Sequence, residues 1–210
     1  MRKIGIFGGT FDPVHLGHLR PALEILGALS LDQIRFIPAG CPPHRAAPVA
    51  PAALRLAMLK AALADQPRFQ LDEREIGRTT PCYTVETLAD LRREFPDAAL
   101  ALMVGMDAFL GFPAWHQWQR LFELAHVVVA HRPGWVFRHQ GELAEHVASR
   151  LTASADELST RLYGKVLFQP VTQLEISATR LREAIAAGRD PRYLVPDAVR
   201  DMIIKSSCYR

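Results

Sequence analysis

The sequence predicts an α/β fold in which a doubly wound parallel sheet carries helices on both faces. Short apolar runs alternate with amphipathic helical patterns along the chain, the order expected for a parallel sheet with crossover helices. Two of these runs, Ala99–Gly105 and Ala125–Ala130, are almost continuously apolar, as strands buried on both faces are. Residues 4–38 read as strand, helix and strand, a unit that implies neighbouring parallel strands and a right-handed crossover.

The composition is that of an ordinary globular protein. Of 210 residues, 49% are hydrophobic and 22% are charged, and the formal net charge is +3. The basic residues are spread along the chain, which favours a phosphorylated small molecule over a nucleic acid as the ligand. No repeat or linker divides the sequence, so we expect one domain over residues 1–210, with a helical C-terminal portion from about residue 177.

Cysteine content and hydropathy indicate the compartment. The three cysteines, Cys41, Cys82 and Cys208, are an odd number without metal-type spacing, as in a reduced intracellular protein. The apolar run at the N-terminus is about four residues long, whereas a signal peptide needs about 7–15. No run approaches the roughly 20 apolar residues that span a bilayer. We therefore expect a cytoplasmic protein with no membrane partner.

The stretch from Lys3 to Leu19 carries the strongest functional signal. A strand over Ile4–Phe7 ends in Gly8-Gly9, a turn follows at Asp12-Pro13, and a helical pattern begins near His15. A strand, a glycine turn and a helix start together offer backbone N–H groups and a positive dipole end to an anion. His15 and His18 would share one helix face, with Cβ atoms roughly 5–6 Å apart. The stretch predicts a phosphate site with two adjustable cations.

Taken alone, each of these residues also has an interpretation that does not involve phosphate binding. Gly8-Gly9 can be only a turn, and His15 and His18 can be two surface side chains. The histidine pair can also be half of a metal site, which would need further ligands. The conjunction of all these features within a short stretch favours the phosphate site.

The remaining elements follow in chain order. Leu19, Leu23, Leu26 and Leu29 predict the inner face of a helix. A helix is expected to begin near Tyr83-Thr84 with Thr84 as its cap, and another at Ser177, with Gly188 just beyond its end. Residues 135–162 have a mixed helical pattern. The other predicted elements are strands at Ile34–Pro38, Arg68–Asp72 and Val166–Phe168, and helices at Ala52–Ala64 and Asp197–Ile204.

Polar residues follow several of the predicted strands. His44 and Arg45 lie in a proline-rich loop that can contact the same anion or be an exposed linker. Asp107 can accept hydrogen bonds from a ribose or cap the next helix. Of Trp115 and Trp118, one is expected in the core and the other against a flat ring, and position alone does not choose between them.

The first turn of the helix after Ser177 has the components of a phosphate clamp. Hydroxyl groups, free N–H groups and an arginine lie within Ser177–Arg182, although such a pattern is also that of an ordinary solvated helix start. No Ser, Cys or Lys nucleophile stands beside a recognisable base, and no carboxylate cluster suggests a metal site. Cations and N–H donors gathered around phosphates suit phosphoryl or nucleotidyl transfer.

Two motifs resemble those of a known superfamily. Gly8 to His18 resembles the G-x-F-D-P-x-H-x-G-H signature of the nucleotidyltransferases, and Ile176 to Arg182 resembles their I-S-S-T-x-x-R signature. More narrowly, the chain resembles the bacterial nicotinate-nucleotide adenylyltransferase family along nearly its whole length. The stretches that carry this second resemblance are Pro43–Arg45, Tyr83–Leu88, Gly105–Asp107, Phe112–Trp115, Arg132–Gly134 and Tyr193–Pro196.

The resemblance implies a Rossmann-like fold and a specific reaction. The phosphate of nicotinate mononucleotide would attack the α-phosphate of ATP in line, giving nicotinate adenine dinucleotide and pyrophosphate, without a covalent intermediate. Magnesium would arrive with ATP and not in a protein cage. The resemblance leaves a homo-oligomer open.

The same resemblance assigns residues to the two substrates. The catalytic residues would be His15, His18 and Arg182. ATP would contact Gly8, Gly9, Thr10, Phe11, His15, His18, Gly105, Asp107, Ile176, Ser177, Thr179 and Arg182. Nicotinate mononucleotide would contact His44, Arg45, Tyr83, Thr84, Trp115, His116 and Arg132, with the Trp115 ring on the pyridine and backbone amides near Thr84 and Trp115 on the carboxylate.

Three positions of the sequence depart from the family pattern. Ala178 stands where Ser is usual, Arg45 replaces the commoner Lys, and His116 stands where Tyr is frequent.

Three other functions are less consistent with the sequence. Phosphopantetheine adenylyltransferase shares the histidine signature but not the Tyr83 and Trp115 stretches. A nicotinamide-cofactor oxidoreductase would have G-x-G-x-x-G after its first strand, and a non-catalytic nucleotide-binding regulator would not need both histidines.

Overall fold

The computed structural model describes residues 1–41, 47–132, 137 and 140–210, and these form a parallel sheet between two layers of helices. Within them the sheet has seven strands in the order β3-β2-β1-β4-β5-β7-β6, and every neighbouring pair is parallel. The strand order reverses between β1 and β4. Ligands of such sheets bind beyond the carboxyl ends of the strands at this point. The strands are β1 (Lys3–Gly9), β2 (Gln33–Pro38), β3 (Phe69–Leu71), β4 (Ala99–Gly105), β5 (His126–His131), β6 (Leu151–Thr152) and β7 (Val166–Pro170).

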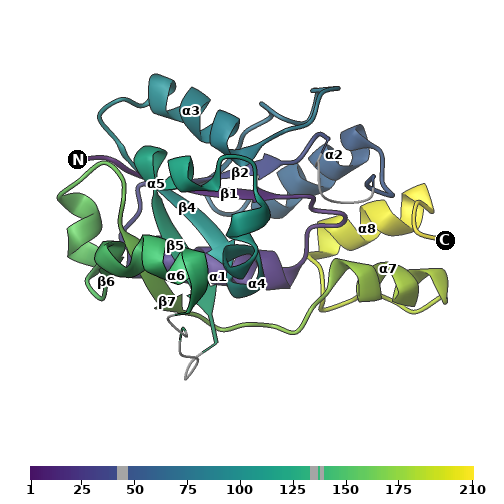
Figure 1. The fold of residues 1–210 in the computed structure, drawn as a ribbon. Helices are drawn as coiled ribbons and strands as arrows, with labels where there is room; N and C mark the ends of the chain where they lie inside the picture. Colours follow the sequence, from purple (N-terminus) through teal and green to yellow (C-terminus); the bar gives the residue numbers. More distant parts are fainter. Residues whose placement is uncertain (42–46, 133–136, 138–139) are drawn as a thin grey trace.

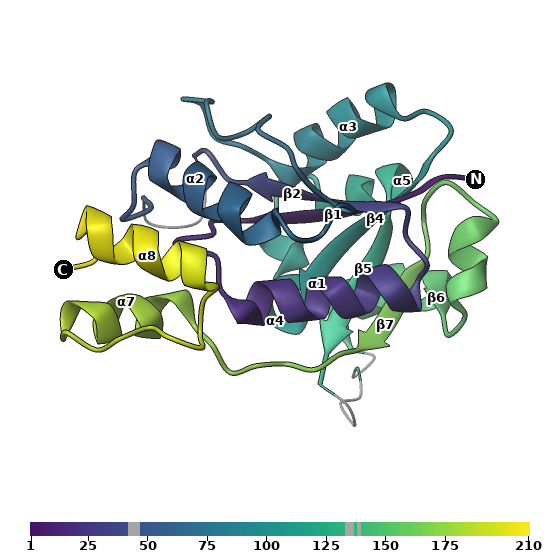
Figure 2. The ribbon, with the colours of Figure 1, turned by 180° about the vertical axis from the view of Figure 1, so that it is seen from behind.

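The helices cover the two faces of the sheet in separate groups. Figures 1 and 2 show α3, α4, α5 and α6 on one face and α1 and α2 on the other, with α7 and α8 side by side at the C-terminal end of the chain. The helices are α1 (Leu16–Ala28), α2 (Ala52–Leu63), α3 (Thr84–Glu94), α4 (Met106–Leu110), α5 (Leu121–Leu124), α6 (Gly141–Val147), α7 (Ala178–Ala186) and α8 (Asp197–Ser206). Short 3₁₀ turns lie at Phe112–Ala114, Trp118–Arg120, Ala148–Arg150 and Ala155–Ser159.

Alternate residues of the central strands enter two different cores. On β4, Ala101 and Met103 pack with residues of α1 and α2, whereas Leu100 and Leu102 pack with residues of α3 and α5. The strand therefore needs an apolar side chain at every position, which explains its continuous apolar run. Burying a Leu side chain in this way contributes roughly 1.5–3 kcal/mol. The predicted doubly wound, Rossmann-like α/β fold is confirmed.

The helix α1 shows how the helical periodicity can be misread. Leu26 and Leu29 are buried as predicted, but Leu23 is 40% exposed. The buried stripe instead consists of Ala22, Ile25, Leu26 and Leu29, which are spaced i, i+3, i+4 and i+7. Leu23 was assigned to the inner face because it is apolar, and that assignment is wrong.

Helix starts are the other point at which the structure differs from the prediction. Tyr83, not Thr84, is the N-cap of α3, and Gly105, not Asp107, is the N-cap of α4. Ser177 is the N-cap of α7, but its side chain makes no capping hydrogen bond. Gly188 follows α7 with a φ of +77°, as the C′ position requires.

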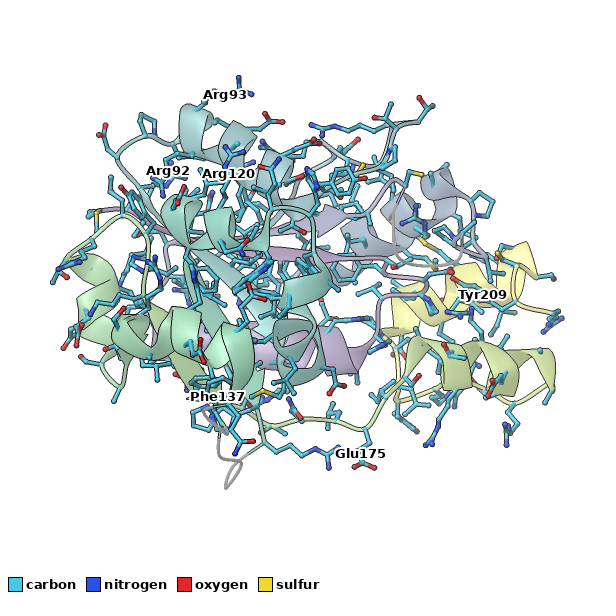
Figure 3. The ribbon with its side chains drawn as sticks, viewed as in Figure 1. Arg92, Arg93, Arg120, Phe137, Glu175 and Tyr209 are labelled. Carbon is cyan, nitrogen blue, oxygen red and sulfur yellow. The ribbon has the colours of Figure 1, made fainter. Side chains whose placement is uncertain are left out.

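A buried carboxylate joins the two ends of the chain. Asp12 is 3% exposed, and its Oδ1 accepts a hydrogen bond of 2.7 Å from the hydroxyl of Tyr209, 197 residues later. The same carboxylate accepts the backbone N–H groups of Val49 at 2.7 Å and Ala50 at 3.1 Å, just before α2. Figure 3 shows Tyr209 beside α8, which packs on α2. The C-terminal helices are thereby fixed to the turn that follows β1.

Tyr209→Phe tests how much the contact between Asp12 and Tyr209 contributes to stability. The variant removes the hydroxyl from a buried carboxylate, so we expect the free energy of unfolding to fall by about 1–3 kcal/mol. Urea unfolding measures the change. Tyr193→Phe is the matched control because Tyr193 is 81% exposed, and it should change stability by less than about 0.5 kcal/mol. Equal losses in the two variants would contradict the assignment.

Candidate active site

The candidate site lies where the carboxyl ends of β1 and β4 diverge. Gly8 and Gly105 are exposed there, and a Cβ added to either would meet no atom within 4 Å. At Gly9 an added Cβ would lie 3.0 Å from the Phe11 ring. The backbone at Gly8 and Gly105 is therefore open to a ligand, while Gly9 makes room for an aromatic side chain that the turn folds beneath itself.

Phe11 shapes the turn. Its φ is +47°, a left-handed conformation that is strained for a bulky residue. Its ring is only 1% exposed and meets the rings of Phe7 and His18 edge-on, with centroids 5.8 and 5.1 Å away. Burial of the ring thus holds the unusual backbone, which directs the next residue, Asp12, into the interior.

The two histidines stand together at the start of α1. His15 is the N-cap and His18 lies in the first turn, and their rings stack with centroids 3.7 Å apart at an angle of 23°. The backbone N–H of His15 donates to Nδ1 of His18 at 3.3 Å. Because Nδ1 accepts this bond, a neutral His18 ring carries its proton on Nε2. The local backbone therefore fixes the tautomer of His18.

Burial changes the expected charge of His15. The residue is 4% exposed, and loss of solvation lowers the pKa of its imidazole to about 4. Near neutral pH the ring is uncharged in the free protein. Of the two predicted adjustable cations, His15 therefore starts from its uncharged form, which sequence spacing could not indicate because it does not reveal how deeply the ring is buried.

Gly17 brings the two signature motifs into contact. A Cβ at this position would lie 3.0 Å from Nδ1 of His15 and 3.4 Å from Cβ of Ile176. The glycine between the two histidines therefore leaves space for the His15 ring on one side and for the segment before α7 on the other. The two motifs, far apart in the sequence, meet at this residue.

Arg182 lies across the turn after β1. Its Nη1 donates to the backbone oxygen of Asp12 at 2.8 Å, and its Nη2 donates to Oγ1 of Thr179 at 3.4 Å. The side chain is about a quarter exposed. These contacts leave further N–H donors of the guanidinium for an anion. Arg182, Thr179 and Ser177 thus lie at the start of α7, beside the histidine-bearing turn.

A second group of predicted residues gathers near the start of α3. The rings of Tyr83 and His116 lie 4.4 Å apart between centroids, and Thr84 is the first residue of α3. Trp115 is half-buried against Phe112, with centroids 4.8 Å apart.

The structure distinguishes the two tryptophans. Trp118 is only 4% exposed and packs with Phe122 and His146, whereas Trp115 keeps part of its ring exposed. Trp118 is therefore a core residue. Of the two, only Trp115 has a ring surface that a ligand can reach.

Other predicted residues lie apart from these contacts. Asp107 is exposed in the first turn of α4. Arg132 is exposed and forms an ion pair of 2.6 Å with Glu175, on the segment that leads to α7 (Figure 3). His44 and Arg45 lie outside the described residues, as do two residues of the predicted Arg132–Gly134 motif.

Sequence reasoning missed two charged residues that hold the site. Asp12 was read only as part of a turn, but its carboxylate anchors the loop before α2. Arg55 is 2% exposed, and its Nη1 donates to the backbone oxygens of Thr10 at 2.8 Å and Ala39 at 2.9 Å. It therefore ties the ends of β1 and β2 together. The sequence feature that could have indicated the burial of Arg55 is its position four residues before Leu59, which puts it on the apolar face of α2.

The donor chemistry of the site suits phosphate. Imidazole, guanidinium, hydroxyl and backbone N–H groups surround the turn after β1, and Asp12, the buried carboxylate there, is already bonded to three protein donors. Among the described residues, no three His, Cys, Asp or Glu side chains are grouped to hold a metal ion. None of the described helices is both long and apolar enough to cross a membrane.

Comparison with known proteins agrees with this geometry. A family model described as cytidylyltransferase-like matches residues 6–184. A relative in Aeromonas hydrophila is 46% identical over 207 residues, with 99% of this chain and 97% of that protein covered, and one in Halorhodospira halophila is 48% identical over 209 residues, with 100% and 96% covered. Both carry the name "Probable nicotinate-nucleotide adenylyltransferase".

The fold is also that of a solved structure. Plasmodium falciparum nicotinic acid mononucleotide adenylyltransferase complexed with NaAD matches with a TM-score of 0.73 at 16% identity, covering 100% of this chain and 98% of that one. This likeness supports the fold, whereas the family rests on the full-length relatives. From the matched family model and from these relatives, the chain belongs to the cytidylyltransferase-like family and, within it, to the nicotinate-nucleotide adenylyltransferases.

Proposed function

We propose that the chain transfers AMP from ATP to nicotinate mononucleotide, giving nicotinate adenine dinucleotide and pyrophosphate in NAD biosynthesis. A phosphate oxygen of the mononucleotide forms a bond to the α-phosphorus of ATP, and the bond from that phosphorus to the pyrophosphate oxygen breaks. The observation that carries the proposal is the meeting of both signature motifs at the end of β1, where Gly17 separates His15 from Ile176. The full-length relatives support the choice of acceptor.

The ATP half of the proposed site is built around the turn after β1. The turn from Gly8 to Phe11, whose backbone is open at Gly8, receives phosphates and nucleotide, and Gly105 and Asp107, across the switch point, receive the adenosine. Arg182, with Ser177 and Thr179 at the start of α7, holds the β- and γ-phosphates. This half therefore combines a permanent cation with backbone donors, the arrangement that stabilises charge in nucleotidyl transfer.

His15 and His18 act on the transferring phosphates. The stacked rings lie at the start of α1, where the helix dipole also favours negative charge. His15 is uncharged in the free enzyme, and a nearby triphosphate raises the pKa of an imidazole by stabilising its charged form. The proposed site thus gains a positive charge when ATP arrives and avoids two stacked cations when it is empty.

The acceptor half lies at the start of α3. The exposed part of the Trp115 ring stacks on the pyridine, and the N–H groups near Thr84 and Trp115 receive the nicotinate carboxylate. The N–H of Trp115 itself donates to the oxygen of Phe112 at 2.7 Å, so this bond must open or be shared. Tyr83 and His116, whose rings are in contact, line this half, together with His44, Arg45 and Arg132. For Arg132 to reach the substrate, its ion pair with Glu175 must open.

The proposal also covers the metal, the compartment and the chain as a unit. Magnesium would enter with ATP, since no metal-holding group of side chains is found among the described residues, and it would supply charge neutralisation. The whole chain acts as one nucleotidyltransferase domain, with its helical part from about residue 177 completing the ATP half. The free thiols of Cys41, Cys82 and Cys208 suit the reducing cytoplasm.

The acceptor is tested by measuring pyrophosphate release from ATP and magnesium. We expect the rate with nicotinate mononucleotide to exceed the rates with nicotinamide mononucleotide and phosphopantetheine, because backbone N–H groups favour a carboxylate over an uncharged amide. A continuous pyrophosphate assay gives kcat/KM for each acceptor. Equal values for the two mononucleotides would overturn the proposed role of the Thr84 and Trp115 amides, and a preference for phosphopantetheine would overturn the function.

His18→Ala tests the catalytic role of the stacked pair. Loss of a group that stabilises transition-state charge should lower kcat by about 100-fold or more. The midpoint of urea unfolding should change little, since His18 is only partly buried. His146→Ala, on α6 in the opposite core, is the matched control and should retain turnover once folded. Near-normal turnover in His18→Ala would refute the mechanism.

The neutral state of His15 predicts a pH dependence of stability. The unfolded chain binds a proton at this residue near pH 6.5, whereas the folded chain binds it only near pH 4. The free energy of unfolding should therefore decrease as the pH falls through this window. At pH 5 the contribution of His15 to this decrease is roughly 2 kcal/mol. The measurement is urea unfolding at pH 7 and pH 5 for the native protein and His15→Gln.

His116→Gln is the control for the same experiment, because His116 is exposed. The His15→Gln variant should lose less stability between pH 7 and pH 5 than the native protein does, and His116→Gln should behave like the native protein. If all three lose the same amount, His15 is not held neutral by the fold.

A further inference from the structure

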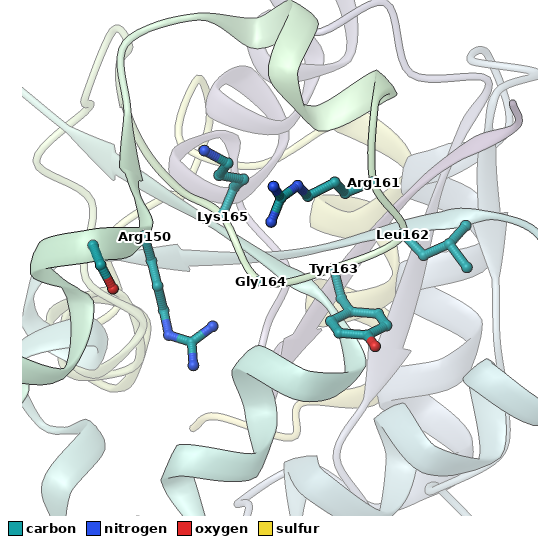
Figure 4. Close-up of a pocket in the computed structure, with 7 residues that line it drawn as sticks. Arg150, Arg161, Leu162, Tyr163, Gly164 and Lys165 are labelled. Carbon is teal, nitrogen blue, oxygen red and sulfur yellow. The ribbon is translucent and has the colours of Figure 1, made fainter.

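A basic pocket lies at the edge of the sheet opposite the candidate active site. Its volume is about 580 Å³, and Arg150, Arg161, Tyr163 and Lys165 contribute to its lining (Figure 4). Arg150 directly precedes β6, and Lys165 directly precedes β7. Both therefore stand at the amino ends of parallel strands, whereas the candidate active site lies beyond the carboxyl ends.

The pocket carries an excess of positive charge. Lys165 pairs with Glu157 at 2.5 Å. Neither Arg150 nor Arg161 forms an ion pair with any residue in the described part of the chain. The Arg150 guanidinium instead lies over the Phe122 ring, 5.6 Å from its centroid. Lys165 and Arg161 both lower the pKa of the Glu157 carboxylate, so the three cations of the pocket share one counter-charge in the described part of the chain.

Buried polar groups fix the loop that forms the pocket. His126 is completely buried, and its Nδ1 accepts the N–H of Lys165 at 3.1 Å. Its Nε2 therefore carries the proton of the neutral ring and donates to the oxygen of Arg161 at 2.9 Å. Arg92 donates to the oxygen of Leu162 at 3.0 Å, and the N–H of Gly164 donates to the oxygen of Ala125 at 3.1 Å.

This anchoring fixes the backbone from which two of the pocket cations extend. Every backbone contact just described belongs to one loop, residues 161–165, which carries Arg161 and Lys165, while Arg150 comes from the segment before β6. Repulsion between such groups costs stability, and an anion in the pocket would relieve it. A preorganised loop also loses less entropy on binding than a flexible one.

The pocket suits a ligand larger than a single phosphate ion. Its volume lies within the roughly 300–1,000 Å³ of small-molecule sites. Arg150 and Arg161 come from separate segments, and each guanidinium can pair with its own phosphate group. Tyr163, 46% exposed, adds an aromatic ring to the lining, and the Arg92 guanidinium lies over this ring, 5.9 Å from its centroid. We propose that this pocket binds an anion with linked phosphate groups, at a second site remote from the active site.

The experiment is a calorimetric titration with inorganic triphosphate in EDTA. The native protein should bind two equivalents, one at the active site and one in the pocket. Arg150→Gln/Arg161→Gln should retain the first and weaken the second by about tenfold or more. Arg93→Gln/Arg189→Gln, which removes two exposed arginines elsewhere, is the matched control and should bind like the native protein. Binding of one equivalent by the native protein, or identical isotherms for both double variants, would overturn the proposal.

Chemical protection gives a readout that does not depend on the variants. Arginine modification by phenylglyoxal, read by peptide mass spectrometry, should be slowed at Arg150 and Arg161 by triphosphate and unchanged at Arg93. Equal modification of Arg150 with and without triphosphate would overturn the proposal.

Repeating the titration with ATP distinguishes the sources of the phosphate chain. Tighter binding of ATP, reduced by Tyr163→Leu, assigns the pocket to nucleotides, and equal affinities assign it to the phosphate chain alone. Either result requires binding in the pocket and so supports the site.

Discussion

The carboxylate of Asp12 is the contact on which the phosphate-binding turn depends. A buried charge is tolerated only when it is fully hydrogen-bonded, and here three donors come from two distant segments, the loop before α2 and the residues that follow α8. The backbone oxygen of the same residue accepts the guanidinium of Arg182. One residue therefore positions the turn after β1, the start of α2 and the arginine of α7, and the shape of the ATP half follows from it.

In the candidate active site the permanently charged group is partly exposed, and the group that can change its charge is buried. Arg182 is partly exposed and always charged, whereas His15 is buried and neutral in the free protein. A second permanent cation in the position of His15 would be buried without a partner and would cost several kcal/mol. An imidazole avoids this cost because it can gain its charge together with the substrate. Buried Arg55 is tolerated because it bonds two backbone oxygens at strand ends.

Local patterns in the sequence were enough for six of the seven strands of the described sheet, most helices and the histidine-bearing turn, because each depends on residues close together in the chain. The position of helix caps was harder to predict: Thr84 has a capping side chain, but the backbone makes Tyr83 the N-cap. Contacts across long separations could not be predicted at all. Nothing near Asp12 indicates a partner 197 residues away, and the two-residue strand β6 has no periodicity to detect. Burial of His15, which decides its charge, is likewise a property of the assembled fold.

The separation between Asp12 and Tyr209 also has a consequence for biosynthesis. A chain made from its N-terminus exposes β1 first, and all seven strands of the described sheet are complete at Pro170, before α7 and α8 are translated. The sheet can therefore form while the Asp12 carboxylate still lacks its tyrosine partner and Arg182 is absent. The core on the α3 and α5 face contains no residue of α7 or α8 and can form first, whereas the other core and the phosphate-binding turn need residues from these last helices. Nucleotide binding is therefore expected to be among the last properties to appear during synthesis.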